Sequence, residues 1–225
     1  MRTMPIAAKS RAREPTAIVG TALGDVRFRS LVGDADWHSL PVAIRSRFSR
    51  RLEAGASAVY AGRITQTSMC RIGWLLAQAA RIIGAPLPLY CEHDVASVVT
   101  VTEDGASGGQ VWTRLYARRC GFPQMIHSAK RFAGPTGLEE HVGRGIGMAL
   151  RVAVRNGALE FHSAGYFIQL FGHRFALPEW ATPGALVVTH AETGPGRFRF
   201  MLVVTHPHFG VLIEQVADYQ DAVPL

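Results

Sequence analysis

The chain has 225 residues, of which 48% are hydrophobic and 18% are charged. This apolar share excludes a largely disordered chain, and the length suits one domain, because β-rich domains commonly run to about 200–250 residues. No apolar run approaches the roughly 18 residues that a membrane-spanning helix needs, so no transmembrane segment is expected.

The chain is basic, with a net charge of +7 that comes almost wholly from arginine. Lys9 and Lys130 are its only lysines, and the arginines are spread along the sequence. The sequence contains no basic helix, zinc finger or aromatic RNA-binding motif, so a nucleic-acid partner is not indicated.

The cysteines indicate a reducing compartment. Cys70, Cys91 and Cys120 are odd in number and form no CxxC pair, so neither a disulfide framework nor a structural zinc site is expected. The first residues also have no apolar segment of the kind that a secretory signal contains. We therefore predict a cytoplasmic protein.

The chain divides into two parts by composition. Residues 1–27 are rich in Ala, Arg, Thr and Gly and are predicted to form a flexible basic extension. Residues 28–225 carry the periodic apolar patterns and are predicted to form a single domain.

The first regular element is a short amphipathic helix. Ser39 can cap its start, apolar residues such as Ile44 and Phe48 recur with near-helical spacing, and Gly55 marks where it has ended. Residues 58–67 then favour a strand, because they contain a threonine-rich run with Tyr and Ile.

Residues 69–83 predict a second helix. Their apolar side chains recur at spacings of three and four, and Gly84 followed by Pro86 supplies the end. Arg71 and Arg81 are among its few polar residues, so the helix is expected to be deeply covered by other elements.

The rest of the chain alternates between apolar and polar residues in short runs, which is typical of antiparallel strands. Residues 103–109 and 194–196 are rich in turn formers, and Asn156-Gly157 is the dipeptide most typical of a tight hairpin. The predicted strands cover residues 95–102, 110–118, 124–132, 146–155, 158–168, 173–177, 186–192, 197–205 and 211–219.

About ten strands joined by short turns must bury one apolar face. We therefore predict an α+β fold that is mostly β, in which a strongly curved antiparallel sheet forms a half-barrel or cup. This sheet is expected to wrap around the two helices of the N-terminal half, with the helix at 69–83 filling the cup.

Several segments of the sequence resemble the bacterial family known as domain of unknown function 4166. The resemblance covers residues 28–221 and is carried by residues 84–88, 111–114, 138–140, 157–159, 177–178, 196–200, 207 and 209–212. It implies a shared fold rather than a reaction. Some members of that family resemble C-terminal extensions of a saccharopine-dehydrogenase-like or epimerase-like nucleotide-binding protein. This chain has no GxGxxG fingerprint, so no cofactor is predicted.

One strand face combines aromatic and basic side chains. Trp112, Arg114 and Tyr116 alternate along one strand and therefore share a face. The outer face of the sheet is the favoured position, but inside the cup these residues would hold an anionic ligand by stacking and bidentate pairing. Arg131 and Tyr166, on other strands, are further candidates for ligand binding.

Three histidines are candidates for a general base. His93, His127 and His162 each lie in or beside a predicted strand, where an imidazole could act together with Arg114 and Tyr116. The sequence does not show which of them, if any, converge.

Two further groups of residues contain side chains that could form a site. Cys91-Glu92-His93-Asp94 gathers a thiol, an imidazole and two carboxylates, for which a polar loop is the favoured interpretation. His206 and His208 share a face in an extended segment, but a metal site needs a third ligand, so no metal is predicted.

These features leave three functions open. The first is binding of a small apolar or aromatic molecule or lipid with an anionic group, held in the cup of the sheet. The second is a cofactor-independent enzyme, such as an isomerase, cyclase or lyase of small-molecule metabolism. The third is an accessory module that docks on a separate nucleotide-binding oxidoreductase through an exposed apolar patch.

Overall fold

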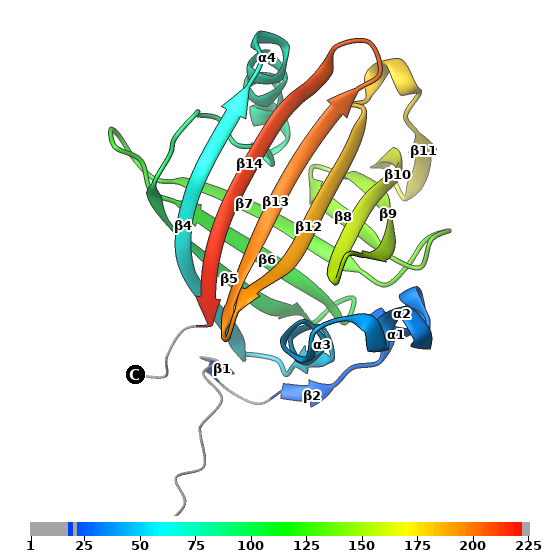
Figure 1. Ribbon diagram of the computed structural model, residues 1–225. Coiled ribbons are helices and arrows are strands. Elements are labelled where there is room, and N and C mark those ends of the chain that lie inside the picture. The colour runs from blue at the N-terminus through cyan, green and yellow to red at the C-terminus, as the bar shows by residue number, and fades with distance from the viewer. Residues whose placement is uncertain (1–17, 20–21, 222–225) are drawn as a thin grey trace, which may run out of the picture.

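The computed structural model describes residues 18–19 and 22–221, and its main feature is a closed antiparallel barrel of ten strands (Figure 1). The barrel order is β4-β14-β13-β12-β10-β9-β8-β7-β6-β5, while the short strand β1 pairs with β4 and β11 pairs with β10. The strands are β1 (Ile18–Val19), β2 (Ala22–Gly24), β3 (Arg50–Leu52), β4 (Ser57–Met69), β5 (Val95–Asp104), β6 (Gly109–Tyr116), β7 (Gln124–Arg131), β8 (Glu139–Gly143), β9 (Ile146–Arg155), β10 (Ala158–Leu170), β11 (His173–Ala176), β12 (Ala185–Gly194), β13 (Arg197–His206) and β14 (Gly210–Asp221). The helices are α1 (Arg27–Val32), α2 (Asp34–Ser39), α3 (Val42–Phe48), α4 (Arg71–Ala79) and the 3-10 turns η1 (Ala80–Ile83) and η2 (Glu179–Ala181).

The long strand β4 closes the barrel. Its residues 60–69 pair with β14, and its residues 57–64 pair with β5 on the other side. The prediction of a mostly β antiparallel fold is confirmed, but the half-barrel or cup is wrong. Closure leaves the ten strands without free edges. A single sequence cannot reveal this closure, because it gives no information on which distant strands pair.

Helices α1, α2 and α3 cover one end of the barrel (Figure 1). Phe28 and Ile44 are fully buried there, and the Phe28 ring lies edge-on to Phe48, with 5.1 Å between the ring centroids. Phe28 also contacts Phe161 of the barrel wall, 6.1 Å between centroids. The sheet therefore does not wrap around its helices, since these three seal one end of it.

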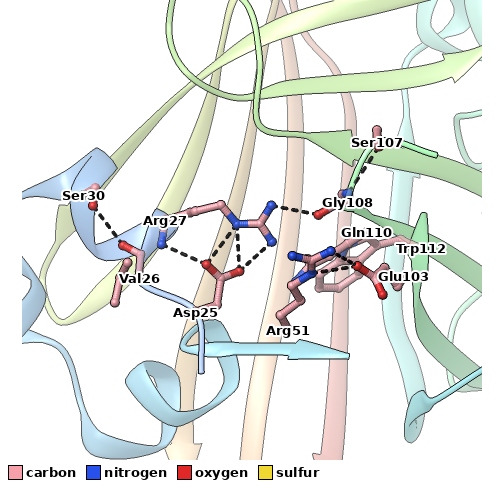
Figure 2. A network of polar contacts seen from close by, with 11 residues as sticks. Asp25, Val26, Arg27, Ser30, Arg51, Glu103, Ser107, Gly108, Gln110 and Trp112 are labelled. Atoms are coloured by element: carbon pink, nitrogen blue, oxygen red, sulfur yellow. Dashed lines mark hydrogen bonds and ion pairs between the residues drawn. The ribbon is translucent and has the colours of Figure 1, made fainter. Parts of the chain in front are cut away.

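Two arginines tie this helical plug to the turn between β5 and β6 (Figure 2). Arg27 pairs with the buried carboxylate of Asp25 at 2.8 Å and donates to the carbonyl oxygen of Gly108 at 2.7 Å. Arg51 of β3 pairs with Glu103 at the end of β5. The plug is thus held by charge pairs at its edge and by aromatic packing in its centre.

Helix α4 lies at the opposite end of the barrel (Figure 1). The predicted helix is confirmed at residues 71–83, including η1, but the expectation that it is deeply covered is wrong. Trp74, Leu75 and Ile82 are exposed, and the helix rests on β14 through Gly73, which contacts Leu212. An apolar pattern around a helix does not distinguish a helix inside a sheet from one that lies across its rim.

The strand predictions agree closely with the structure, with a few exceptions. β8 (Glu139–Gly143) was not among the predicted strands. Most of the predicted extension, residues 1–17 and 20–21, lies outside the described residues, while β2 and the start of α1 fall within it. Among the described residues, no helix has the length and apolar character needed to cross a membrane.

Candidate functional site

The barrel encloses a cavity of about 460 Å³. It opens between the segment formed by α4, η1 and residues 86–88 on one side and residues 177–183 on the other. The volume lies in the range of pockets that bind small organic molecules, which is roughly 300–1,000 Å³. The plug of α1–α3 closes the far end, so the cavity opens at the α4 end.

Most of the cavity wall is apolar. Every barrel strand except β4 contributes to it, and the aliphatic and aromatic wall residues include Val99, Trp112, Ile126, Met148, Phe161, Leu186, Val188, Phe200, Leu202 and Ala217. These positions alternate with outward-facing ones along each strand, as the pleat requires. A ligand in this cavity would therefore be enclosed mainly by carbon.

A compact polar cluster interrupts the apolar wall. Lys130 of β7 and Glu140 of β8 are only 5% and 6% exposed, and the Nζ atom of Lys130 lies 3.0 Å from Oε2 of Glu140. Arg114 of β6 lies 3.8 Å from the other carboxylate oxygen and donates from Nη1 to Oγ of Ser128 at 3.1 Å. Adjacent strands thus bring four polar side chains to one place on the inner wall.

The charges of this cluster are strongly coupled. Burial alone would raise the pKa of Glu140, but the ammonium group of Lys130 and the guanidinium group of Arg114 outweigh it and hold this pKa at about 2. Burial lowers the pKa of Lys130, and the carboxylate of Glu140 opposes that effect. Glu140 is therefore an anion at neutral pH.

The cluster leaves one positive charge unmatched. Among the residues that the structure describes, Arg114, Lys130 and Glu140 are the charged ones that line the cavity, so by formal charge two cations face one anion. An unmatched charge in an apolar enclosure is unfavourable, and a bound anion would relieve it. This surplus is the strongest indication of what the cavity can hold.

Two phenols, the buried Tyr219 and the partly buried Tyr116, add hydrogen-bonding groups to the wall. Burial raises the pKa of both Tyr116 and Tyr219, so each phenol is neutral at physiological pH. The Tyr219 oxygen lies 2.8 Å from the hydroxyl of Ser97. Tyr166 also lines the cavity, and its hydroxyl donates to the carbonyl oxygen of Gly184 near the opening.

Comparison with known families agrees with the extent of the fold. The family model described as a domain of unknown function, DUF4166, matches residues 40–218. The chain belongs to the DUF4166 family. No curated protein and no solved structure matches it. The matched range runs from the end of α2 through nearly all of β14, so it includes every residue that lines the cavity of this DUF4166 domain except Tyr219.

The aromatic and basic strand face of this DUF4166 domain points inward. Trp112, Arg114 and Tyr116 all line the cavity, whereas the sequence favoured the outer face. Arg131 follows Lys130 and therefore lies on the outer face of β7, where it pairs with Asp104 at 3.2 Å. Of the five predicted ligand-binding residues, only Arg131 lies away from the cavity.

The three candidate general bases are not brought together. His127 is exposed on the outer face of β7 and lies 3.0 Å from the hydroxyl of Thr113. His162 lies 2.8 Å from Glu160, two residues away on the same face of β10. His93 is exposed in the loop before β5, where its carbonyl oxygen accepts a hydrogen bond from Arg119. None of the three lines the cavity.

The loop that contains Cys91 makes surface ion pairs. Cys91 is exposed, Asp94 pairs with Arg63 at 2.8 Å, and Glu92 lies 3.7 Å from Arg118. Within the described part of the chain, no three side chains of the types that bind metals gather into a possible metal site.

A different histidine is buried in the barrel. His190 of β12 stacks on Phe198, with 4.7 Å between ring centroids, beside a second cavity of about 40 Å³ next to the plug. Burial holds the pKa of His190 well below its usual value, and the neighbouring Arg47 adds to the effect. This imidazole is therefore neutral and forms part of the aromatic packing beneath α3.

Lys130 and Glu140 were not identified from the sequence. Two signals could have pointed to Lys130. It is one of only two lysines among 24 basic residues, and it shares one face of its strand with Ile126 and Ser128. Glu140 carried no such signal, because it lies in a short strand that the alternation of apolar and polar residues did not predict.

Proposed function

We propose that the barrel binds an apolar or aromatic small molecule that carries one anionic group. The anionic group would lie beside Arg114 and Lys130, and the apolar body would fill the space toward the opening at α4. The observation that carries this proposal is the single unmatched positive charge in an otherwise apolar enclosure.

The geometry supports Arg114 as the main contact of the anion. Lys130 already has a carboxylate partner at 3.0 Å, whereas Arg114 is 3.8 Å from that carboxylate and its other strong contact is a neutral hydroxyl. A guanidinium group can also offer two parallel hydrogen bonds to a carboxylate or sulfonate. The nearby phenol of Tyr116 is neutral and can donate a further hydrogen bond.

A matched pair of fluorescent probes tests the proposal. Anilinonaphthalene sulfonate is aromatic and anionic, and N-phenyl-1-naphthylamine has the same ring system without the charge. We expect both to bind the wild-type protein. We expect Arg114→Gln to weaken binding of the sulfonate by about 10- to 100-fold, the usual worth of a charged hydrogen bond, and to leave the neutral probe nearly unaffected.

Arg131→Gln is the matched control, because it removes an arginine from the neighbouring strand on the outer face of the same barrel. This variant should bind both probes like the wild type. Equal losses of both probes in Arg114→Gln, or an equal effect of the two arginine variants, would contradict the proposal. If the probes behave as expected, native mass spectrometry of the protein from its own host, followed by denaturing extraction, would identify the natural ligand.

A further inference from the structure

The open end of the barrel is rimmed by large apolar side chains that are exposed. Phe171 at the turn between β10 and β11 is 98% exposed, Trp180 of η2 is 85% exposed, and Ile82 of η1 is 73% exposed. Leu75 of α4 and Phe209 in the turn between β13 and β14 are also exposed. Figure 1 shows α4, β11 and the turn between β13 and β14 at the end away from α1–α3.

This apolar rim continues into the cavity. Trp180 itself lines the opening, and Leu76 and Ile83, the neighbours of Leu75 and Ile82, line it from the other side. The side chains come from four separate segments around the opening rather than from one helix or sheet face. Large exposed apolar side chains gathered around an opening are typical of an interaction site.

The conformation of Phe171 indicates that the aromatic side chain has a role at this position. Phe171 has a φ of 51° and is followed by Gly172 at 81°, and the same turn geometry occurs at Asn156 and Gly157, with φ of 50° and 73°. Asn-Gly is the preferred pair for such a turn, and a bulky residue with positive φ is strained. A strained phenylalanine at a fully exposed tip is therefore not explained by folding.

The same end of the barrel is basic. The connecting segments at this end, residues 70–94, 117–123, 144–145, 171–184 and 207–209, carry six arginines and three acidic residues. Arg71, Arg81 and Arg144 are exposed, and none of them forms an ion pair with any residue that the structure describes. Arginines without an acidic partner, among exposed Phe, Trp, Ile and Leu, are the combination that binds anionic bilayers.

We propose that this rim docks on the surface of a bilayer that contains anionic lipids, with the cavity opening turned toward the membrane. The apolar tips would enter the region between headgroups and acyl chains, and the free arginines would face the lipid phosphates. Docking rests on the rim alone. Exchange of a ligand between bilayer and cavity would rest in addition on the proposed function.

Vesicle flotation with the full chain tests the docking. We expect the protein to float with vesicles of phosphatidylcholine and phosphatidylglycerol in equal parts, to bind vesicles of phosphatidylcholine alone much more weakly, and to be released by high salt. The double variant Phe171→Asn with Ile82→Ser should bind the mixed vesicles at least about tenfold more weakly, because it removes two inserted side chains.

The variants separate docking from folding and from ligand binding. Phe171→Asn gives the turn the residue that Asn156 supplies elsewhere, so it should not reduce stability. Val42→Ser, at a 71% exposed position on the plug, is the matched control and should bind vesicles like the wild type. Arg114→Gln should also keep vesicle binding, so that loss of probe binding and loss of docking are distinguishable.

Two results would overturn the proposal. One is failure of the wild-type protein to bind either kind of vesicle, as expected if the rim is instead covered by another protein. The other is equal vesicle binding by the wild type and the double variant at the rim.

Discussion

Replacement of Glu140 by glutamine tests the charge balance inside the barrel. Glu140 is buried, and its closest partner is the ammonium group of Lys130 at 3.0 Å. The variant keeps the shape of the side chain but removes its charge, so Lys130 and Arg114 would face each other as two buried cations without an anion. We expect the folded state to be markedly less stable at neutral pH.

The magnitude follows from the pKa of Glu140, which is about 2 in the folded protein against an ordinary value of 4.5. At about 1.4 kcal/mol for each pH unit, this difference corresponds to roughly 3 kcal/mol of stability. Since the folded-state pKa is the lower one, the stabilisation is fully present above pH 4.5 and is lost as the pH falls toward 2. The gap between wild type and variant should close over that window.

Urea denaturation followed by circular dichroism, at a series of pH values, measures this gap. Asp218→Asn is the control, because Asp218 pairs with Arg199 on the surface and such pairs contribute less than about 1 kcal/mol. The reasoning is refuted if Glu140→Gln and Asp218→Asn cost the same at pH 7. It is also refuted if the gap stays constant down to pH 2, since the loss would then come from packing.

Three further predictions concern the cavity, its rim and the plug. Val188→Phe adds volume inside the cavity, so it should abolish binding of both fluorescent probes while changing the stability by no more than about 1–2 kcal/mol, measured by probe titration and urea denaturation. Gly73→Ala places a methyl group against the backbone of Leu212, so α4 should shift from β14, with a loss of about 1–3 kcal/mol in urea denaturation and faster amide exchange in α4. Burial alone would raise the pKa of Asp25, but the Arg27 guanidinium outweighs this effect and lowers the pKa below its ordinary value of 3.8. Asp25→Asn should therefore destabilise the plug above pH 3.8, and this loss should shrink as the pH falls below that value, as measured by thermal unfolding.

Local patterns in the sequence were sufficient to predict most of the strands. Strand β9 occupies residues 146–155 as predicted, and Asn156-Gly157 forms the tight turn to β10. Both features depend on neighbouring residues only, because alternation and turn chemistry act over a few positions. Position in the sheet is a different matter, since it depends on which distant strands pair.

Alternation along a strand predicts whether a side chain points into or out of the barrel only where the strand is regular. His162 and Tyr166 are four residues apart and would share a face in a regular strand. The register of β10 against β9 shifts between Ser163 and Tyr166, a stretch that contains Gly165 with a φ of 130°. This bulge leaves His162 on the outer face and turns Tyr166 into the cavity.

The sequence also could not show whether the barrel is hollow. A barrel of about eight strands has an interior just wide enough for its own side chains, and the interior widens as strands are added. Here ten strands close, and the two groups of helices lie at the ends rather than inside. Large inward side chains such as Trp112 and Phe161 therefore leave about 460 Å³ between them.

Closure and charge act together in this interior. The hydrogen-bonded wall holds Arg114, Lys130 and Glu140 on three successive strands, so the three charged groups cannot move apart to be hydrated separately. An anion that enters the cavity loses its water but meets a cationic surplus that is already in place, which reduces the reorganisation that binding requires. A neutral ligand of the same shape gains only the apolar contacts. Selectivity for anionic over neutral ligands should therefore fall when Arg114 is neutralised and rise when Glu140 is neutralised, because the two residues set the sign of the charge inside the cavity.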